Sequence, residues 1–209
     1  MAKYIKPDLS SSQSVTDFVT VSGEFCIFVE NLPRFAKKDL LDKLRKLLPL
    51  LYIKASLLPK VDPFYDDGNE KFVTEQDWEN IHTQLKIKLG YHDEYPDIYD
   101  PLTHEQVEES IASISDNIAD IYQDLKNFIS LYNIGNEEMM NDALWECTMN
   151  FEEYWGQRLV SALKAIHMVY FSGDDLSDDD TSDNDNPDND TDTSDWIISK
   201  RQRDLRKED

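Results

Sequence analysis

The chain has 209 residues and a mass of 24.4 kDa, which is the size of one ordinary globular domain with an appended segment. Hydrophobic residues make up 40% of it and include 4 Trp, 10 Tyr and 9 Phe, so the chain can bury a sizeable core without a metal ion or disulfide bonds. Its 43 acidic and 21 basic residues give a formal net charge of -22, which repels phosphate backbones and anionic membrane surfaces, so we expect no direct binding to nucleic acid or membranes.

Three helices are predicted in the first half of the chain, over residues 15–32, 36–58 and 74–89. The third has the clearest ends, because Thr74 and Asp77 have the spacing of a capping box and a glycine follows its last residue. The connections after the second and third helices are rich in proline, aspartate and tyrosine, which is typical of loops. No alternating pattern predicts a strand, so we expect an all-α fold.

The second half is predicted to form a long helical hairpin. One helix covers residues 103–134 and begins with Thr103 and Gln106 as a capping box, and the next helix extends to Phe171. Because only a short turn around Gly135 separates two long amphipathic helices, we expect them to pack antiparallel within a bundle of about five helices. The apolar seam of the first helix, with spacings of 3 and 4, consists of Val107, Ile111, Ile114, Ile118, Ile121, Leu125, Phe128 and Tyr132.

Acidic charge is concentrated in the segment 174–195, which holds eleven aspartates, no basic residue and a charge of -11. Its other residues offer too little apolar surface to offset the entropy of folding, so we expect this segment to be disordered. The last fourteen residues carry +2, which leaves -13 for residues 1–173. We therefore divide the chain into a helical domain over 1–173, an acidic disordered linker over 174–195, and a short apolar and basic element over 196–209.

The final element combines an apolar cluster, Trp196, Ile197 and Ile198, with five basic residues that follow it. Such a segment on a flexible tether can dock onto a partner groove or fold back onto its own acidic domain, because the tether keeps its local concentration high. The alternative is a solvated tail that contacts nothing. The sequence leaves both interpretations open.

The cysteines and the apolar runs predict a cytoplasmic protein. Cys26 and Cys147 lie within apolar segments and lack the CxxC spacing of a metal or redox site, so we interpret both as reduced core residues. The first thirteen residues contain no apolar stretch of a secretory signal. The longest apolar run, around Leu50, is far too short to span a membrane.

The strongest candidate polar site consists of Asn117, Asp120 and Asp124, which line one edge of the apolar seam. Two carboxylates four residues apart repel each other, so they favour a cation or a basic partner nearby. We expect Arg158, on the next helix, to form an ion pair with one of these aspartates. The alternative is a magnesium ion held by the carboxylates, as in small all-α enzymes that hydrolyse nucleotides.

Other polar residues predict no catalytic centre. His167 flanks the core stripe of the last helix, and we interpret it as a hydrogen-bonded residue at the core boundary. A single Glu-x-x-His motif, Glu79 with His82, falls short of the two motifs and two further glutamates that a di-iron bundle requires. The chain has no Ser/His/Asp or Cys/His arrangement and no glycine-rich phosphate loop, so we expect neither a cofactor nor a metal.

Four stretches of the sequence together resemble a known family. They are Leu48-Pro49-Leu50-Leu51-Tyr52, the helix from Trp78 to Gly90, Asp120-Ile121-Tyr122-Gln123-Asp124-Leu125, and Trp155-Gly156. In this order, spread over residues 15–171, they resemble the domain-of-unknown-function family DUF5063 of Bacteroides-type bacteria. The resemblance implies an all-helical cytoplasmic domain and brings no established activity with it.

Together these observations favour a noncatalytic cytoplasmic protein that binds another macromolecule, with an as yet unidentified protein as its partner. One alternative is a small magnesium-dependent helical hydrolase that acts on a phosphorylated substrate through Asp120 and Asp124. A second alternative is that the acidic linker imitates nucleic acid and occupies basic proteins.

Overall fold

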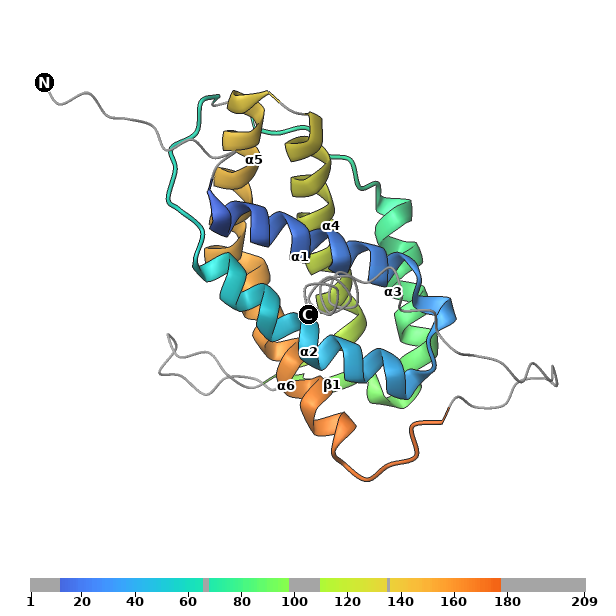
Figure 1. The fold of residues 1–209 in the computed structure, drawn as a ribbon. Helices are drawn as coiled ribbons and strands as arrows, with labels where there is room; N and C mark the ends of the chain where they lie inside the picture. The colour runs from blue at the N-terminus through green and yellow to red at the C-terminus, as the bar shows by residue number, and fades with distance from the viewer. Residues whose placement is uncertain (1–11, 66–67, 98–109, 135, 178–209) are drawn as a thin grey trace, which may run out of the picture. The chain divides into compact units, whose positions relative to one another are not determined.

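The described part of the chain forms five helical rods, and the expected all-α class is confirmed (Figure 1). A computed structural model of the chain describes residues 12–65, 68–97, 110–134 and 136–177. In these residues the helices are α1 (Gln13–Glu30), α2 (Lys37–Ser56), α3 (Glu75–Leu89), α4 (Ile114–Ile134), and a last rod made of α5 (Glu137–Asn150), a π-helical turn (Phe151–Trp155) and α6 (Gly156–Tyr170). Short 3-10 turns, Leu32–Arg34 and Gly90–His92, follow α1 and α3.

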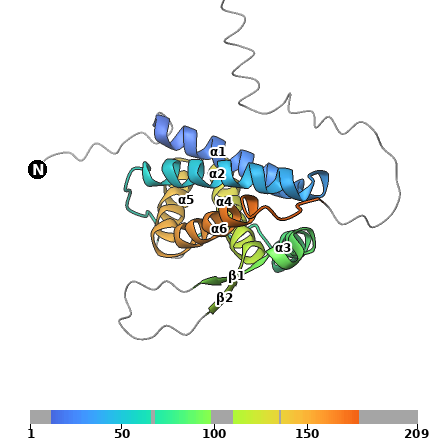
Figure 2. The same cartoon turned by 90° about the horizontal axis from the view of Figure 1, so that it is seen from below.

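The helices form two layers (Figures 1 and 2). α1 and α2 pack side by side in one layer, which lies across α4, α5 and α6. α4 is the central helix, because it packs against α1, α3, α5 and α6. The predicted packing of the two C-terminal helices against each other is therefore confirmed.

Aromatic side chains fill the space between the layers. Trp155 is fully buried and stacks on Phe18, with 6.5 Å between ring centroids and 16° between the ring planes. Phe18 also contacts Phe128 of α4, at 5.3 Å between centroids. Such rings contribute large apolar areas to a core. Within the described ranges, no helix combines the length and apolar composition required to cross a membrane.

The ends of α3 follow the sequence prediction. The Thr74 hydroxyl accepts the Asp77 backbone N–H at 3.2 Å, and the Asp77 carboxylate accepts the Thr74 backbone N–H at 2.9 Å. At the other end, Gly90 has φ of 58°, a left-handed conformation that glycine adopts without steric cost. The predicted capping box and glycine stop are both confirmed.

The predicted helix over 103–134 begins too early, and the expectation of no strand is wrong. Residues Glu94–Asp97 form strand β1 and Ser110–Ser113 form strand β2, which pair antiparallel next to the start of α4. Ile111 belongs to β2 and is 76% exposed, although the apolar spacing placed it in the helical seam. The predicted cap at Thr103 and Gln106, together with Val107, lies outside the described residues.

A different capping arrangement explains why α4 begins at Ile114. The Ser113 hydroxyl accepts the Asp116 backbone N–H at 3.0 Å. The Asp93 carboxylate accepts the backbone N–H and the hydroxyl of Ser115, at 2.8 and 2.6 Å. These acceptors satisfy N–H groups of the first helical turn, so the helix starts where the strand ends.

The glycine in the middle of the last rod permits the π-turn. A Cβ atom on Gly156 would lie 2.3 Å from the carbonyl oxygen of Phe151, five residues earlier. No side chain can occupy that position, since the wide turn brings this carbonyl against the Gly156 α-carbon. The sequence predicted a continuous helix here, and the structure interrupts it at Phe151–Trp155.

Polar side chains fasten the long connection between α2 and α3 to the bundle. The buried Asp142 carboxylate accepts the backbone N–H groups of two successive loop residues, at 2.6 and 3.0 Å. Asn127 Oδ1 accepts the backbone N–H groups of Phe72 and Val73, at 2.7 and 2.9 Å. The described residues of this connection form no helix or strand, but α4 and α5 hold its backbone in place.

Beyond α6, the described chain continues to residue 177. Leu176 is buried, and Asp174 Oδ2 lies 3.3 Å from His92 Nε2. The chain separates into two compact units, 1–178 and 179–209, and the second unit lies outside the described residues. The predicted boundary after residue 173 and the expected disorder of 174–195 stay predictions.

Candidate functional site

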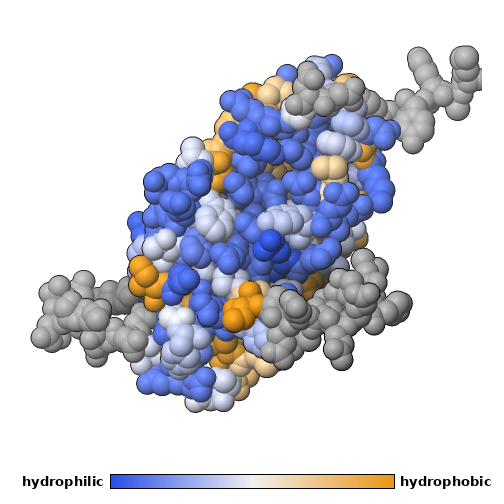
Figure 3. All heavy atoms as spheres, turned by 180° about the vertical axis from the view of Figure 1, so that it is seen from behind, coloured by the Kyte–Doolittle hydropathy of each residue, from blue (hydrophilic) through white to orange (hydrophobic). Residues whose placement is uncertain are grey.

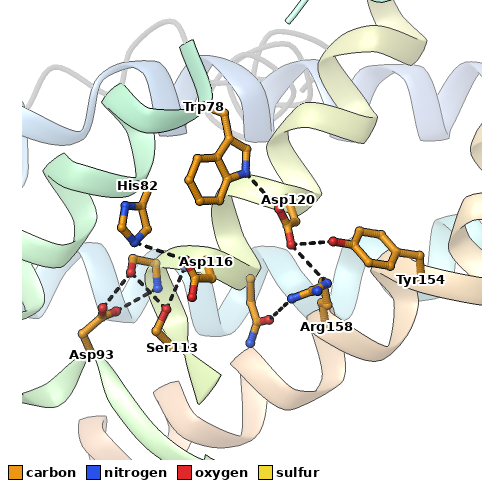
Figure 4. A network of polar contacts seen from close by, with 10 residues as sticks. Trp78, His82, Asp93, Ser113, Asp116, Asp120, Tyr154 and Arg158 are labelled. Atoms are coloured by element: carbon orange, nitrogen blue, oxygen red, sulfur yellow. Dashed lines mark hydrogen bonds and ion pairs between the residues drawn. The ribbon is translucent and has the colours of Figure 1, made fainter. Parts of the chain in front are cut away.

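A network of polar contacts joins α3, α4, the π-turn and α6 around Asp120 (Figure 4). Asp120 Oδ1 accepts the indole N–H of Trp78 at 2.8 Å. Asp120 Oδ2 accepts the Tyr154 hydroxyl at 2.8 Å and pairs with Arg158 Nε at 3.1 Å. The Asp120 side chain is only 13% exposed, so its charge is largely withdrawn from water and compensated by these three donors.

Arg158 extends the network toward the β1–β2 hairpin. Its Nη1 donates to Asn117 Oδ1 at 3.2 Å, and Asn117 Nδ2 donates to the Tyr95 hydroxyl at 2.5 Å. The Arg158 guanidinium also lies over the ring of Tyr154, 4.4 Å from its centroid. Burial raises the pKa of Tyr95 to about 12, so its hydroxyl stays protonated at neutral pH. The structure therefore brings together Asn117, Asp120 and Arg158 among the predicted site residues.

The π-turn sets which side chains of the last rod reach this network. Cys147, Phe151, Trp155 and Leu159 follow one another at steps of four residues, and in a regular α-helix three such steps drift by about 120° around the axis. The π-turn holds one residue more than an α-helical turn, and this rotates the residues that follow back toward the core. Trp155 therefore remains buried. Tyr154 then faces Asp120 instead. The sequence prediction of a continuous helix missed this turn, and the repeated steps of four are the signal that could have indicated it.

Asp124, one turn after Asp120, has a different partner. Its Oδ1 accepts the Asn150 side-chain amide at 2.8 Å, and the described contacts of Arg158 run to Asp120 instead. Burial raises the pKa of Asp124 to about 6, and the hydrogen bond from Asn150 opposes that rise. The two aspartates therefore occupy separate environments: one is paired with a cation, and the other is partly desolvated beside an amide.

A second polar cluster lies next to the network in Figure 4. His82 Nε2 is 3.1 Å from Asp116 Oδ1, and the His82 ring stacks on Trp78, with 5.0 Å between centroids. Sequence reasoning considered His82 only with Glu79 and missed Asp116. It also missed Trp78 and Tyr154 as partners of Asp120, because these residues meet only across helices.

The other predicted contact residues lie elsewhere. His167 is exposed near the end of α6, where its ring lies 4.8 Å from that of Phe171. No described contact joins it to the Asp120 network. The tail cluster of Trp196, Ile197 and Ile198 lies outside the described residues.

An open groove of about 1030 Å³ borders the network. Side chains of α2, the hairpin, α4, the π-turn and α6 line it, and Asn117 and Arg158 belong to its lining. Three large hydrophobic residues in it are strongly exposed: Tyr52 at 41%, Tyr154 at 44% and Val160 at 51%. The groove thus combines apolar and aromatic surface with several polar and charged side chains, and such a mixture can bind and orient a ligand.

The carboxylates near the groove do not form an open metal site. Over the described ranges, no group of three or more His, Cys, Asp or Glu residues is arranged to hold a metal ion. Both Asp120 oxygens already accept from protein donors, and Asp124 accepts from Asn150. At Asp120 a magnesium ion would have to displace these donors, because it needs carboxylate oxygens and waters in octahedral geometry.

The chain is similar to one family model and to a solved structure. The family model for the domain of unknown function DUF5063 matches residues 10–172. The crystal structure of protein BF1032 from Bacteroides fragilis, a structural genomics target, is 38% identical and superposes with a TM-score of 0.71. The similarity covers 79% of this chain and 98% of that one. A search of curated proteins found no match.

Proposed function

The chain belongs to the DUF5063 family, and we propose that it is a noncatalytic interaction protein that binds a segment of a protein partner in the groove beside Arg158. The family is described only as a domain of unknown function, so the proposal rests on the groove itself. One observation carries it. Three large hydrophobic side chains, Tyr52, Tyr154 and Val160, are exposed together within one hollow.

A partner that covers these exposed side chains gains binding free energy. Burying one such side chain fully is worth about 1.5–3 kcal/mol, so covering three partly exposed ones can contribute several kcal/mol to binding. All three side chains line the same groove, so one partner segment can cover them together. The Asp120 network holds Tyr154 in place before a partner arrives, which reduces the entropy lost on binding.

A peptide selection tests the proposal directly. Random peptides displayed on phage are selected on the intact protein, and the selected peptides are then measured against two variants of α6. Val160→Gln places a polar side chain in the groove, whereas Met168→Gln changes an exposed hydrophobic residue outside it. We expect the first variant to weaken binding about tenfold or more and the second to leave it unchanged. A selection that yields no binder, or binders that ignore Val160→Gln, overturns the proposal.

The competing function is a magnesium-dependent hydrolase, for which Asp120 and Asp124 were the candidate ligands. If the protein is a noncatalytic interaction protein, magnesium chloride titrated into it in a calorimeter should give no single-site isotherm. The reason is that both carboxylates already accept hydrogen bonds from protein groups. A tight single-site isotherm that disappears in Asp120→Asn would favour the hydrolase.

The proposed setting is the cytoplasm. Cys26 and Cys147 are free and buried, and burial raises the pKa of both thiols well above the ordinary range. Unpaired core thiols of this kind are compatible with a reducing compartment, where cysteines stay reduced. Fractionation of the producing cell, with the protein recovered in the membrane or secreted fraction, would contradict this placement.

A further inference from the structure

The charges that line the groove have one prevailing sign. Asp97 comes from β1, and Glu152 and Glu153 come from the π-turn, whereas Arg158 is the basic residue among the described lining residues. Arg158 is already paired with Asp120 at 3.1 Å, so its charge is offset from within the protein. A ligand in this groove therefore meets a negative potential beside apolar and aromatic surface.

The acidic residues of the π-turn are accessible. Glu152 and Glu153 are both exposed, and Glu152 is 3.1 Å from Lys60, whose side chain is 84% exposed. An ion pair between two exposed side chains contributes little to stability. A basic group from a partner can replace Lys60 without a large loss of free energy.

The net charge of the helical domain supports the same preference. Residues 1–173 carry a net charge of -13, and the face opposite the α1–α2 layer is mainly hydrophilic with small separate hydrophobic patches (Figure 3). An acidic protein attracts basic partners over long range and accelerates their association. The same field disfavours acidic segments and nucleic acid at the groove.

The aromatic residues supply a contact that suits arginine in particular. This protein already stacks arginine on tyrosine twice, with Arg158 over Tyr154 at 4.4 Å and Arg45 over Tyr170 at 4.5 Å. In the groove, Tyr52 meets Phe151 edge to face at 5.2 Å and keeps 41% of its surface exposed. A planar guanidinium can therefore stack on aromatic surface while acidic side chains of the same groove compensate its charge.

We propose that the groove selects a basic partner segment, in which arginine or lysine side chains alternate with apolar residues, and rejects acidic segments. This inference rests on the function proposed above and adds the chemical class of the partner. Charge complementarity carries it, together with the aromatic and apolar lining. It assigns Glu153 as a residue that determines specificity.

Three labelled synthetic peptides of equal length test the inference by fluorescence anisotropy with the full-length protein. The first alternates arginine and leucine, the second replaces arginine with glutamate, and the third replaces leucine with serine. We expect the first to bind, the second not to bind, and the third to bind more weakly because it lacks apolar contacts. Raising the salt concentration is expected to weaken the first complex without abolishing it, since its apolar part is not screened.

A matched pair of charge reversals separates the groove from the overall acidity of the chain. Glu153→Lys reverses a charge in the groove, and Glu79→Lys makes the same change on the exposed face of α3, outside the groove. Affinity for the arginine and leucine peptide is expected to fall about tenfold in the first variant and to change little in the second. Circular dichroism of both variants checks that the helices are intact.

The outcomes separate this inference from the function on which it rests. If the glutamate and leucine peptide binds and Val160→Gln abolishes that binding, the groove is a binding site but the basic preference is wrong. If Glu153→Lys and Glu79→Lys weaken the first peptide equally, the attraction is general and the inference is overturned. If sedimentation shows a dimer that Val160→Gln dissociates, the groove belongs to a second copy of the chain, which also overturns it. If no peptide depends on Val160, the proposed function itself fails.

Discussion

Replacing Asp124 with asparagine is expected to stabilise the protein at neutral pH, because the carboxylate is held in a partly desolvated position. Burial raises the pKa of Asp124 from its ordinary 3.8 to about 6, with smaller increases from Asp120 and Glu146 and opposing effects of Asn150 and Lys71. This rise in pKa corresponds to about 3 kcal/mol. Because the side chain keeps some contact with solvent, we expect a gain of about 1–2 kcal/mol.

The pH dependence of this gain follows from the protonation of both states. Below pH 3.8 the Asp124 carboxyl is protonated whether the chain is folded or unfolded, so burial costs nothing. Between about pH 3.8 and pH 6 the unfolded chain ionises while the folded state keeps its proton, so the free energy of unfolding falls across this window and levels off above it. Asparagine stays neutral throughout, and its Oδ1 can still accept the Asn150 amide.

Urea denaturation of the wild type and Asp124→Asn between about pH 4 and pH 8 measures this difference. The free energy of unfolding of the variant should exceed that of the wild type at pH 7, and the two should converge toward pH 4. Asp39→Asn, an exposed change on α2, serves as the control and should give no such trend. A difference between Asp124→Asn and wild type that is zero or negative at pH 7 and constant with pH would refute the reasoning.

Three further predictions concern stability. In a double-mutant cycle of Asp120→Ala and Arg158→Ala, urea denaturation should give a coupling energy of about 0.5–2 kcal/mol, and strict additivity would reject the ion pair. Gly156→Ala should lower the free energy of unfolding by about 2–4 kcal/mol, because its Cβ would meet the Phe151 carbonyl, and an unchanged melting temperature would contradict the π-turn. Asp142→Ala should lower the free energy of unfolding by about 2–3 kcal/mol and speed hydrogen exchange at the backbone amides of Phe64 and Tyr65, which donate to this carboxylate. Exchange rates equal to those of the wild type would show that Asp142 does not hold the loop.

The extent of agreement between sequence and structure depends on how local each feature is. The capping box of Thr74 and Asp77 and the stop at Gly90 were predictable, because a few neighbouring residues complete these motifs. The start of α4 was not, because Ile111 fits a helical spacing but pairs with β1 instead. The motif of Ser113 and Asp116 was present in the sequence as the correct start signal, although a second candidate at Thr103 competed with it.

The site was predictable to the extent that its residues share one helix. Asn117, Asp120 and Asp124 lie on one edge of the seam, and the excess of acidic charge required a cation such as Arg158. Whether Arg158 pairs with Asp120 or with Asp124 depends on the register of α6 against α4. That register is set by the π-turn, whose signal in the sequence is only a repeated spacing of four.

The sequence by itself determined the all-α class, the order of the five helical rods and the acidic character of the domain, because these follow from residue periodicity, end caps and counted charges. Only the tertiary structure decided that Trp78, Asp120 and Tyr154 meet, and that Tyr52 and Val160 border one groove. Contacts between helices depend on packing of whole side-chain surfaces, so no local pattern encodes them. The apolar spacing allowed either Tyr154 or Trp155 in the core, and the structure with its π-turn buries Trp155 and leaves Tyr154 44% exposed.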